Sequence, residues 1–162
     1  MTTKTRIPFA PAAVRDFLKR DADFTAVVPA ELISTRDVPR MIDRPFVTCR
    51  SAMTGGPGDP MMRTPLVQVD VWVPKSEILA AGPMNITADP EEVAWDIAGL
   101  AGEIIGRARA VPFRNCSWNG DWKDGPMNMI DKTRGVENPL YRAPVRVELS
   151  MRMTVAPTFT WL

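Results

Sequence analysis

Residues 142–155 read RAPVRVELSMRMTV, and this stretch decides the fold class. Every second position from Val145 to Val155 is apolar, and the positions between them carry charged or hydroxyl side chains. This alternation is typical of a β-strand with one buried face and one face in water. The run is long for a strand in a small domain and lies near the end of the chain. We therefore expect it to close a sheet.

Length and composition indicate one globular domain over residues 1–162, with an arm at 1–10 and a tail at 156–162. Of the 162 residues, 45% are hydrophobic and 24% are charged, enough for a real core. The net charge of +1 argues against a general attraction to nucleic acid or to a membrane. No segment has the apolar length that spans a bilayer, and the N-terminus does not read as a signal peptide. We expect synthesis in a cytoplasm.

The side chains that usually carry catalysis are scarce. The chain has no histidine, which removes the commonest general base and the commonest metal ligand. Cys49 and Cys116 belong to no C-x-x-C pair, so two buried thiols are a better interpretation than a zinc site, although a disulfide stays open. The loop at 55–58 contains Pro57 and precedes no helix, so it does not predict a phosphate site. We expect no catalytic residue, no metal, no cofactor and no enzymatic activity.

Periodicity and breakers place the remaining elements. We expect helices at 11–21 and 89–108, and loops at 54–64 and 123–140. We expect strands at 32–34, 46–53, 66–73 and 113–122 before the final one. This order predicts an α+β fold: a mainly antiparallel sheet of four to five strands with two helices packed on one face. Asp70 falls on the polar face of its strand, either solvated or paired with an arginine across the sheet.

The helix expected at 89–108 has two faces of different character. Val93, Ile97, Leu100, Ile104 and Ala108 form the apolar face. A second face gathers Trp95, Gly99, Gly102 and Gly106. Each glycine inside a helix costs about 1 kcal/mol relative to alanine, so close approach of another element should offset this cost. That element is either the first helix or a loop of the same chain, or a neighbouring subunit.

Arginines cluster at Arg36, Arg40, Arg44 and Arg50. Aromatic residues that would stack nucleobases are nearly missing from this region, so it does not predict a nucleic-acid site. Pairing with acidic residues of another subunit is one interpretation, and a solvated face is the other. Met61 and Met62 lie in the loop expected at 54–64, where flexible thioether side chains suit an adaptable contact surface.

The order of elements resembles the tail terminator proteins of long-tailed, siphovirus-type bacteriophages. The similar segments are an N-terminal helix ending in DADFTAVVP, followed by RPFVTCRSAM, PLVQVDVWV, DPEEVAWDIAGLAGEII and YRAPVRVELSMRMTV, and the resemblance covers about residues 12–155. The resemblance implies a small α+β subunit of a hexameric ring. That ring caps the tail tube, ends its polymerisation and joins the tail to the head connector.

The resemblance also implies partners and a location. The partners would be further copies of the chain, the tail tube protein and a head-tail connector or head-closure protein. We expect no membrane contact and no specific nucleic-acid binding, although the genome would pass through the ring. The chain would be assembled in the host bacterial cytoplasm and reside in the tail or neck of the virion. Head-to-tail contacts in a ring require two different surfaces on each subunit. Our candidates for the subunit contacts are Trp95, Gly99, Gly102, Gly106, Arg36, Arg40, Arg44 and Arg50. Our candidates for the tube and connector contacts are Met61, Met62, Arg63, Lys132 and Arg134.

Two other functions stay open at this stage. One is another neck component, such as a head-closure or tail-completion protein, which shares the size and the lack of catalytic residues. The other is a small-molecule-binding or enzymatic domain, which a deep polar pocket would favour.

Overall fold

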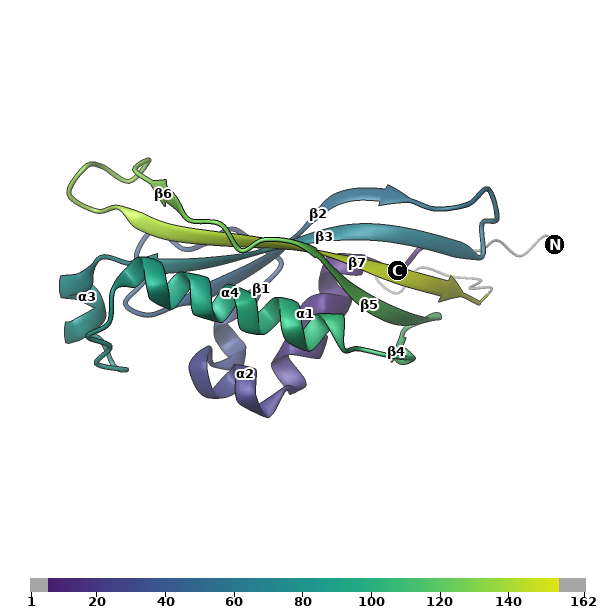
Figure 1. Cartoon of the computed structure of the whole chain (residues 1–162), viewed down its shortest axis with the longest axis horizontal. Helices are drawn as coiled ribbons and strands as arrows, with labels where there is room; N and C mark the ends of the chain where they lie inside the picture. Colours follow the sequence, from purple (N-terminus) through teal and green to yellow (C-terminus); the bar gives the residue numbers. More distant parts are fainter. Residues whose placement is uncertain (1–5, 155–162) are drawn as a thin grey trace.

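The computed structural model describes residues 6–154, and its centre is a twisted sheet (Figure 1). The sheet has seven strands in the order β1-β2-β3-β7-β5-β4, with β6 also pairing with β7. The strands are β1 Ile33–Ser34, β2 Phe46–Gly55, β3 Met62–Pro74, β4 Val111–Phe113, β5 Cys116–Asp124, β6 Met129–Asp131 and β7 Leu140–Met153. Strand β1 runs parallel to β2, and every other pair is antiparallel. The α+β class is confirmed, but the sheet is larger than the four to five strands expected, and it is mixed.

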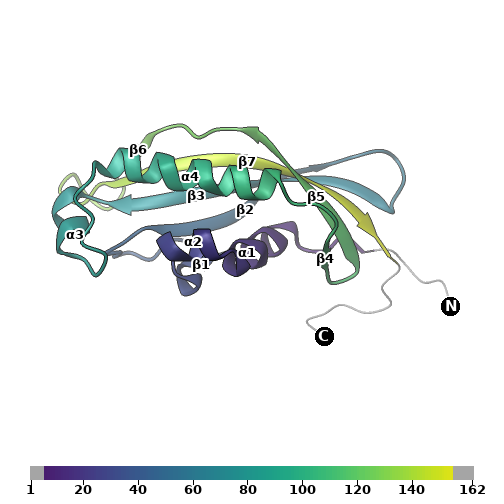
Figure 2. The same cartoon turned by 60° about the horizontal axis from the view of Figure 1, so that its bottom comes forward.

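The helices are α1 Ala10–Arg20, α2 Ala22–Val27, α3 Ser76–Ala81 and α4 Pro90–Gly106, with a 3-10 turn at Ala30–Leu32. The sequence predicted α1 and α4 and missed the two short helices. Helices of six residues are too short to show a 3.6-residue period, and α2 is fixed by a local cap, in which Asp21 Oδ1 accepts a hydrogen bond from the Phe24 amide at 2.9 Å. Figure 2 shows α1, α2 and α4 on one face of the sheet.

The core lies between that face and the helices. Val145, Val147 and Leu149 of β7 are fully buried, as are the alternate valines of β3 from Val67 to Val73. These are the apolar positions that the period-2 pattern predicts. The last residue of the predicted run, Val155, lies outside the described part of the chain, as do the expected tail at 156–162 and the first five residues of the expected arm.

Helix α4 meets the sheet mainly through alanines, and the predicted apolar face is only partly used. Ala94, Ala98, Ala101 and Ile105 are fully buried. Of the predicted face, Ile97 and Ala108 are buried, whereas Val93, Leu100 and Ile104 are only partly buried against the core. Small side chains allow the helix axis to lie close to the strands, which a count of large apolar residues does not reveal. Helix α4 also contacts α1 and α2 beside it.

Both long loops are shorter than expected. Strands β2 and β3 together reduce the loop expected at 54–64 to residues 56–61. In the segment expected as a loop at 123–140, β5 extends to Asp124 and β6 pairs with the start of β7. A cis Gly125–Pro126 bond interrupts the path between β5 and β6. The turns 56–61 and 132–139 lie at opposite ends of the long sheet (Figure 1).

Candidate functional site

The face of α4 that carries Trp95 divides into an open half and a filled half. Trp95 is 45% exposed, and a Cβ added at Gly99 would meet nothing within 4 Å. Further along, a Cβ at Gly102 would lie 2.6 Å from Cε2 of Trp122, and one at Gly106 would lie 3.4 Å from Cβ of Trp122. Trp122 of β5 therefore explains the close approach at Gly102 within one chain. Trp95 and Gly99 remain available to a neighbour.

Sequence reasoning missed the strand residue that packs closest to α4. A Cβ at Gly120 of β5 would overlap the carbonyl oxygen of Ile105. The Gly120 amide donates a hydrogen bond to the carbonyl of Ala108 at 3.0 Å, which fixes the end of the helix against β5. A glycine in the middle of a strand often marks the close approach of another backbone, so Gly120 was the signal in the sequence that could have predicted this contact.

The four arginines of the cluster have different partners. Arg50 forms an ion pair with Asp37, and Arg44 Nε lies 3.7 Å from Asp43. Arg36 and Arg40 are exposed, and neither forms an ion pair with a residue between 6 and 154. Asp37 and Arg50 tie the chain that follows β1 to the neighbouring strand β2. The cluster is therefore partly neutralised inside one molecule and partly free.

The candidates at the 56–61 turn stand at the mouth of a cleft. Met62 is 43% exposed and begins β3 rather than lying in a loop. Arg63 Nη1 donates a hydrogen bond to the Pro57 carbonyl at 2.9 Å, which holds the turn. Met62 and Arg63 line a cleft of about 450 Å³ together with Trp118 and Arg152. Met61, the third candidate here, is half-buried in the turn itself.

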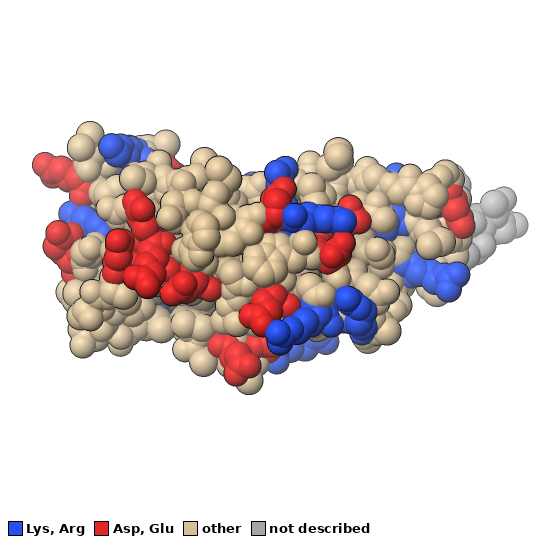
Figure 3. All heavy atoms as spheres, viewed as in Figure 1, with Lys and Arg blue, Asp and Glu red and all other residues tan. Residues whose placement is uncertain are grey.

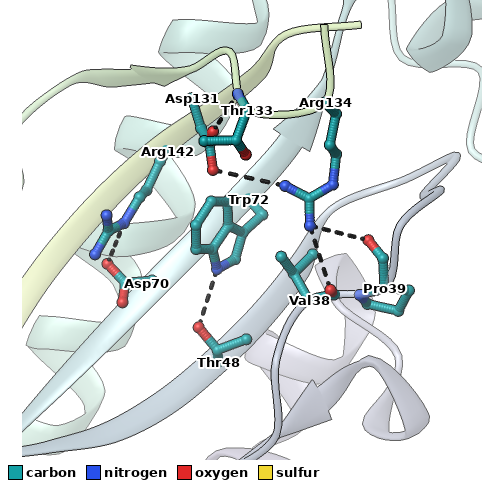
Figure 4. Close-up of polar contacts among 9 residues, drawn as sticks. All are labelled: Val38, Pro39, Thr48, Asp70, Trp72, Asp131, Thr133, Arg134 and Arg142. Atoms are coloured by element: carbon teal, nitrogen blue, oxygen red, sulfur yellow. Dashed lines mark hydrogen bonds and ion pairs between the residues drawn. The ribbon is translucent and has the colours of Figure 1, made fainter.

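Of the two candidates at the 132–139 turn, one side chain is exposed and the other is bound within the chain. Lys132 is exposed. Arg134 is half-buried, and its Nη2 donates hydrogen bonds to the carbonyls of Val38 and Pro39 at 3.3 and 3.4 Å, while Nη1 lies 3.6 Å from Asp131 (Figure 4). Arg134 thus fastens the β6–β7 hairpin to the segment after β1. Hydrogen bonds from Thr133 lower the pKa of Asp131, so this anchor stays ionised.

A buried ion pair stabilises the sheet face that the helices leave uncovered. Arg142 Nε donates to Asp70 Oδ1 at 2.8 Å, and the Asp70 side chain is only 4% exposed. The guanidinium of Arg142 lies 5.0 Å from the ring centroid of Trp72, whose Nε1 donates to Thr48 Oγ1 at 2.9 Å (Figure 4). The alternative in which Asp70 pairs across the sheet is confirmed. This network joins β2, β3 and β7.

The thiols are poor candidates for chemistry. Cys49 and Cys116 are free and buried. Burial raises the pKa of Cys49 to about 12 and that of Cys116 to about 11, so neither supplies a thiolate nucleophile near neutral pH. Between residues 6 and 154, no group of three or more acidic or cysteine side chains could hold a metal ion. No helix in this range is long and apolar enough to cross a membrane.

Comparison with known proteins adds a likeness of fold. No family model matches the chain, and no curated protein matches it. Among solved structures, the chain is similar to one from the virion of a native gene transfer agent particle, with 15% sequence identity and a TM-score of 0.51. The match covers 86% of this chain and 93% of the other. At this identity the likeness establishes a shared fold over nearly the whole of both chains.

Proposed function

We propose that the protein is a structural subunit of a tailed, phage-like virion and that it acts as the tail terminator. The observation that carries this proposal is the fold likeness to a chain of a gene transfer agent virion, which extends over 86% of this chain. The resemblance to tail terminators rests on independent grounds, namely the order of elements and the sequence of β3, α4 and β7. Both lines lead to the same class of particle.

The shape of the subunit supports a position between two partners. The turns 56–61 and 132–139 lie at opposite ends of the sheet, so one subunit offers different contact residues in two directions (Figure 1). Met62 and Arg63 stand at one end, and Lys132 stands at the other. A terminator needs this arrangement, because one side of its ring meets the tail tube and the other meets the head connector.

The role we propose is one of assembly, without catalysis. Six copies would form a ring by repeated head-to-tail contacts, and its seat on the last tube ring would prevent addition of further tube subunits. The genome would pass through the opening without strong general attraction to the ring, as the near-zero net charge favours.

Negative-stain electron microscopy of the purified protein, alone and with preassembled tail tubes, tests the proposal. We expect six-fold rings with a central hole, or, if the tube templates assembly, a ring at one end of each tube. A closed dimer that leaves both tube ends bare would contradict the proposal. Met62→Asp, which places a charge on the exposed first residue of β3, should reduce capping while leaving the melting temperature unchanged.

A further inference from the structure

We propose that the outer face of α4, formed by Glu92, Trp95, Asp96 and Gly99, docks on the arginine segment at residues 36–40 of a second copy of this chain. The inference rests on the proposed ring, for which it supplies the contact between neighbouring subunits. Its occupant is specific: the guanidinium groups of Arg36 and Arg40.

The outer face of α4 has the composition of an arginine-binding surface. Trp95 presents a large exposed ring, and the open space above Gly99 allows a partner to lie against the helix. Glu92 and Asp96 flank the ring, and neither forms an ion pair with a residue of the described range 6–154. Figure 3 shows acidic side chains gathered over this N-terminal half of α4. A guanidinium group stacks on an indole and pairs with a carboxylate, which an ammonium group does less well.

The matching cations are on the segment that follows β1. Arg36 and Arg40 are exposed without an ion pair in the described part of the chain, whereas Arg44 and Arg50 are paired with Asp43 and Asp37. One molecule therefore carries unpaired carboxylates at one place and unpaired guanidinium groups at another. Complementary charges of this kind favour association in one register over others.

The two surfaces lie on different sides of the subunit. Arg36 follows β1, the strand at one edge of the sheet, and the Asp37–Arg50 pair fixes this segment to β2. The outer face of α4 is on the side of Gly102, which contacts Trp122 of β5 near the other edge. Figure 2 shows α1, α2 and β1 along one side of α4, and β5 and β6 along the other. Surfaces placed in this way join copies head to tail, and such contacts form a closed ring when the rotation between neighbouring copies closes.

Exchanging the charges of the two surfaces tests the contact. Sedimentation velocity measures the self-association of each variant at protein concentrations up to about 1 mM. E92R/D96R and R36E/R40E should each weaken self-association by at least about tenfold, because like charges then face each other. The quadruple variant should restore association, since it only exchanges the signs. D23R/E137R, which reverses two exposed acids elsewhere, is the matched control and should associate as the wild type does. Thermal melting verifies that each variant is folded.

Three results would overturn the contact: wild-type protein that forms no ring at about 1 mM, either alone or on tail tubes, pair variants that associate normally, or a quadruple variant that fails to recover. Tube capping distinguishes this outcome from failure of the proposed function. If pair variants assemble and cap tubes normally, the contact is wrong and the terminator role stands. If the charge exchange succeeds and no tube is capped, the contact stands and the terminator role is wrong.

Discussion

Three glycines of α4 look equivalent in the sequence, but the structure separates them. Gly99 faces open space, and Gly102 lies under the ring of Trp122. Gly99→Ala should stabilise the protein by about 0.5–1 kcal/mol, since alanine favours the helix and meets no neighbour. Gly102→Ala should destabilise it by about 1–2 kcal/mol, because the new methyl group must displace the Trp122 ring. Urea unfolding of the two variants measures both effects.

A second substitution isolates the cause at Gly102. In the background of Trp122→Ala, the overlap is gone, and Gly102→Ala should become neutral or stabilising. An unchanged penalty in that background would show that something other than Trp122 fills the space. If Gly102→Ala leaves folding intact and blocks self-association, the face belongs to a subunit contact instead.

The buried thiols give a second prediction at the scale of single residues. With pKa values of about 12 and about 11, Cys49 and Cys116 stay protonated at pH 8. Native protein should therefore react negligibly with a thiol reagent, and protein unfolded in guanidinium should react at both positions. Rapid labelling of the native protein at either cysteine would contradict the burial described.

At the scale of elements, two arginines of β7 test the difference between a buried and an exposed ion pair. Arg142 pairs with the buried Asp70. Arg146 pairs with Asp124, and the side chains of Arg146 and Asp124 are each about half exposed. Arg142→Met removes the cation from a buried carboxylate, which then keeps only the hydrogen bonds from Gln68, and should cost about 3 kcal/mol of stability. Arg146→Met should leave the stability nearly unchanged, because water screens an exposed ion pair. Equal losses in denaturant unfolding would contradict the role given to the Asp70 pair.

The β6–β7 hairpin should respond to acid. Hydrogen bonds from the side chain and the backbone of Thr133 lower the pKa of Asp131. The folded pKa thus lies below the unfolded one, so the stabilisation is present above the unfolded value, about 3.9, and is lost as pH falls through the folded value. The protection of the Thr133 amide, measured as its exchange rate relative to the intrinsic rate at each pH, should fall in that acid range. Asp131→Asn should lose this pH dependence, and a wild-type hairpin insensitive to acid would contradict the anchor.

The elements predicted from sequence were those with a long, clean period. Strand β7 and the alternate valines of β3 show the period of two, and α4 begins with a capping aspartate followed by proline. The short strand expected at 32–34 is present as β1. Strands β4 and β6 and helices α2 and α3 are too short for a period, so tertiary pairing and, at α2, a local cap decide them. The sequence could not predict the partner of Gly102 either, because Trp122 of β5 reaches it only when the helix packs on the sheet.

At the scale of the whole molecule, the candidate contacts were only partly predictable. Exposed Trp95, Met62 and Lys132 occupy positions open to partners. Arg50 and Arg134, by contrast, have partners inside the chain, because the segment after β1 folds back toward β2 and toward the β6–β7 hairpin. A list of arginines cannot distinguish the two situations. Their assignment to subunit, tube or connector contacts stays a prediction.

The most direct measurement of the central claim is the length of tail tubes. Tube protein should be assembled with and without this chain, and the lengths should be compared by electron microscopy. We predict that tubes grown without the chain are long and variable, and that adding it gives shorter tubes that carry a ring at one end and stop growing. Tubes that keep growing at the same rate, with both ends bare in the presence of the chain, would contradict the account.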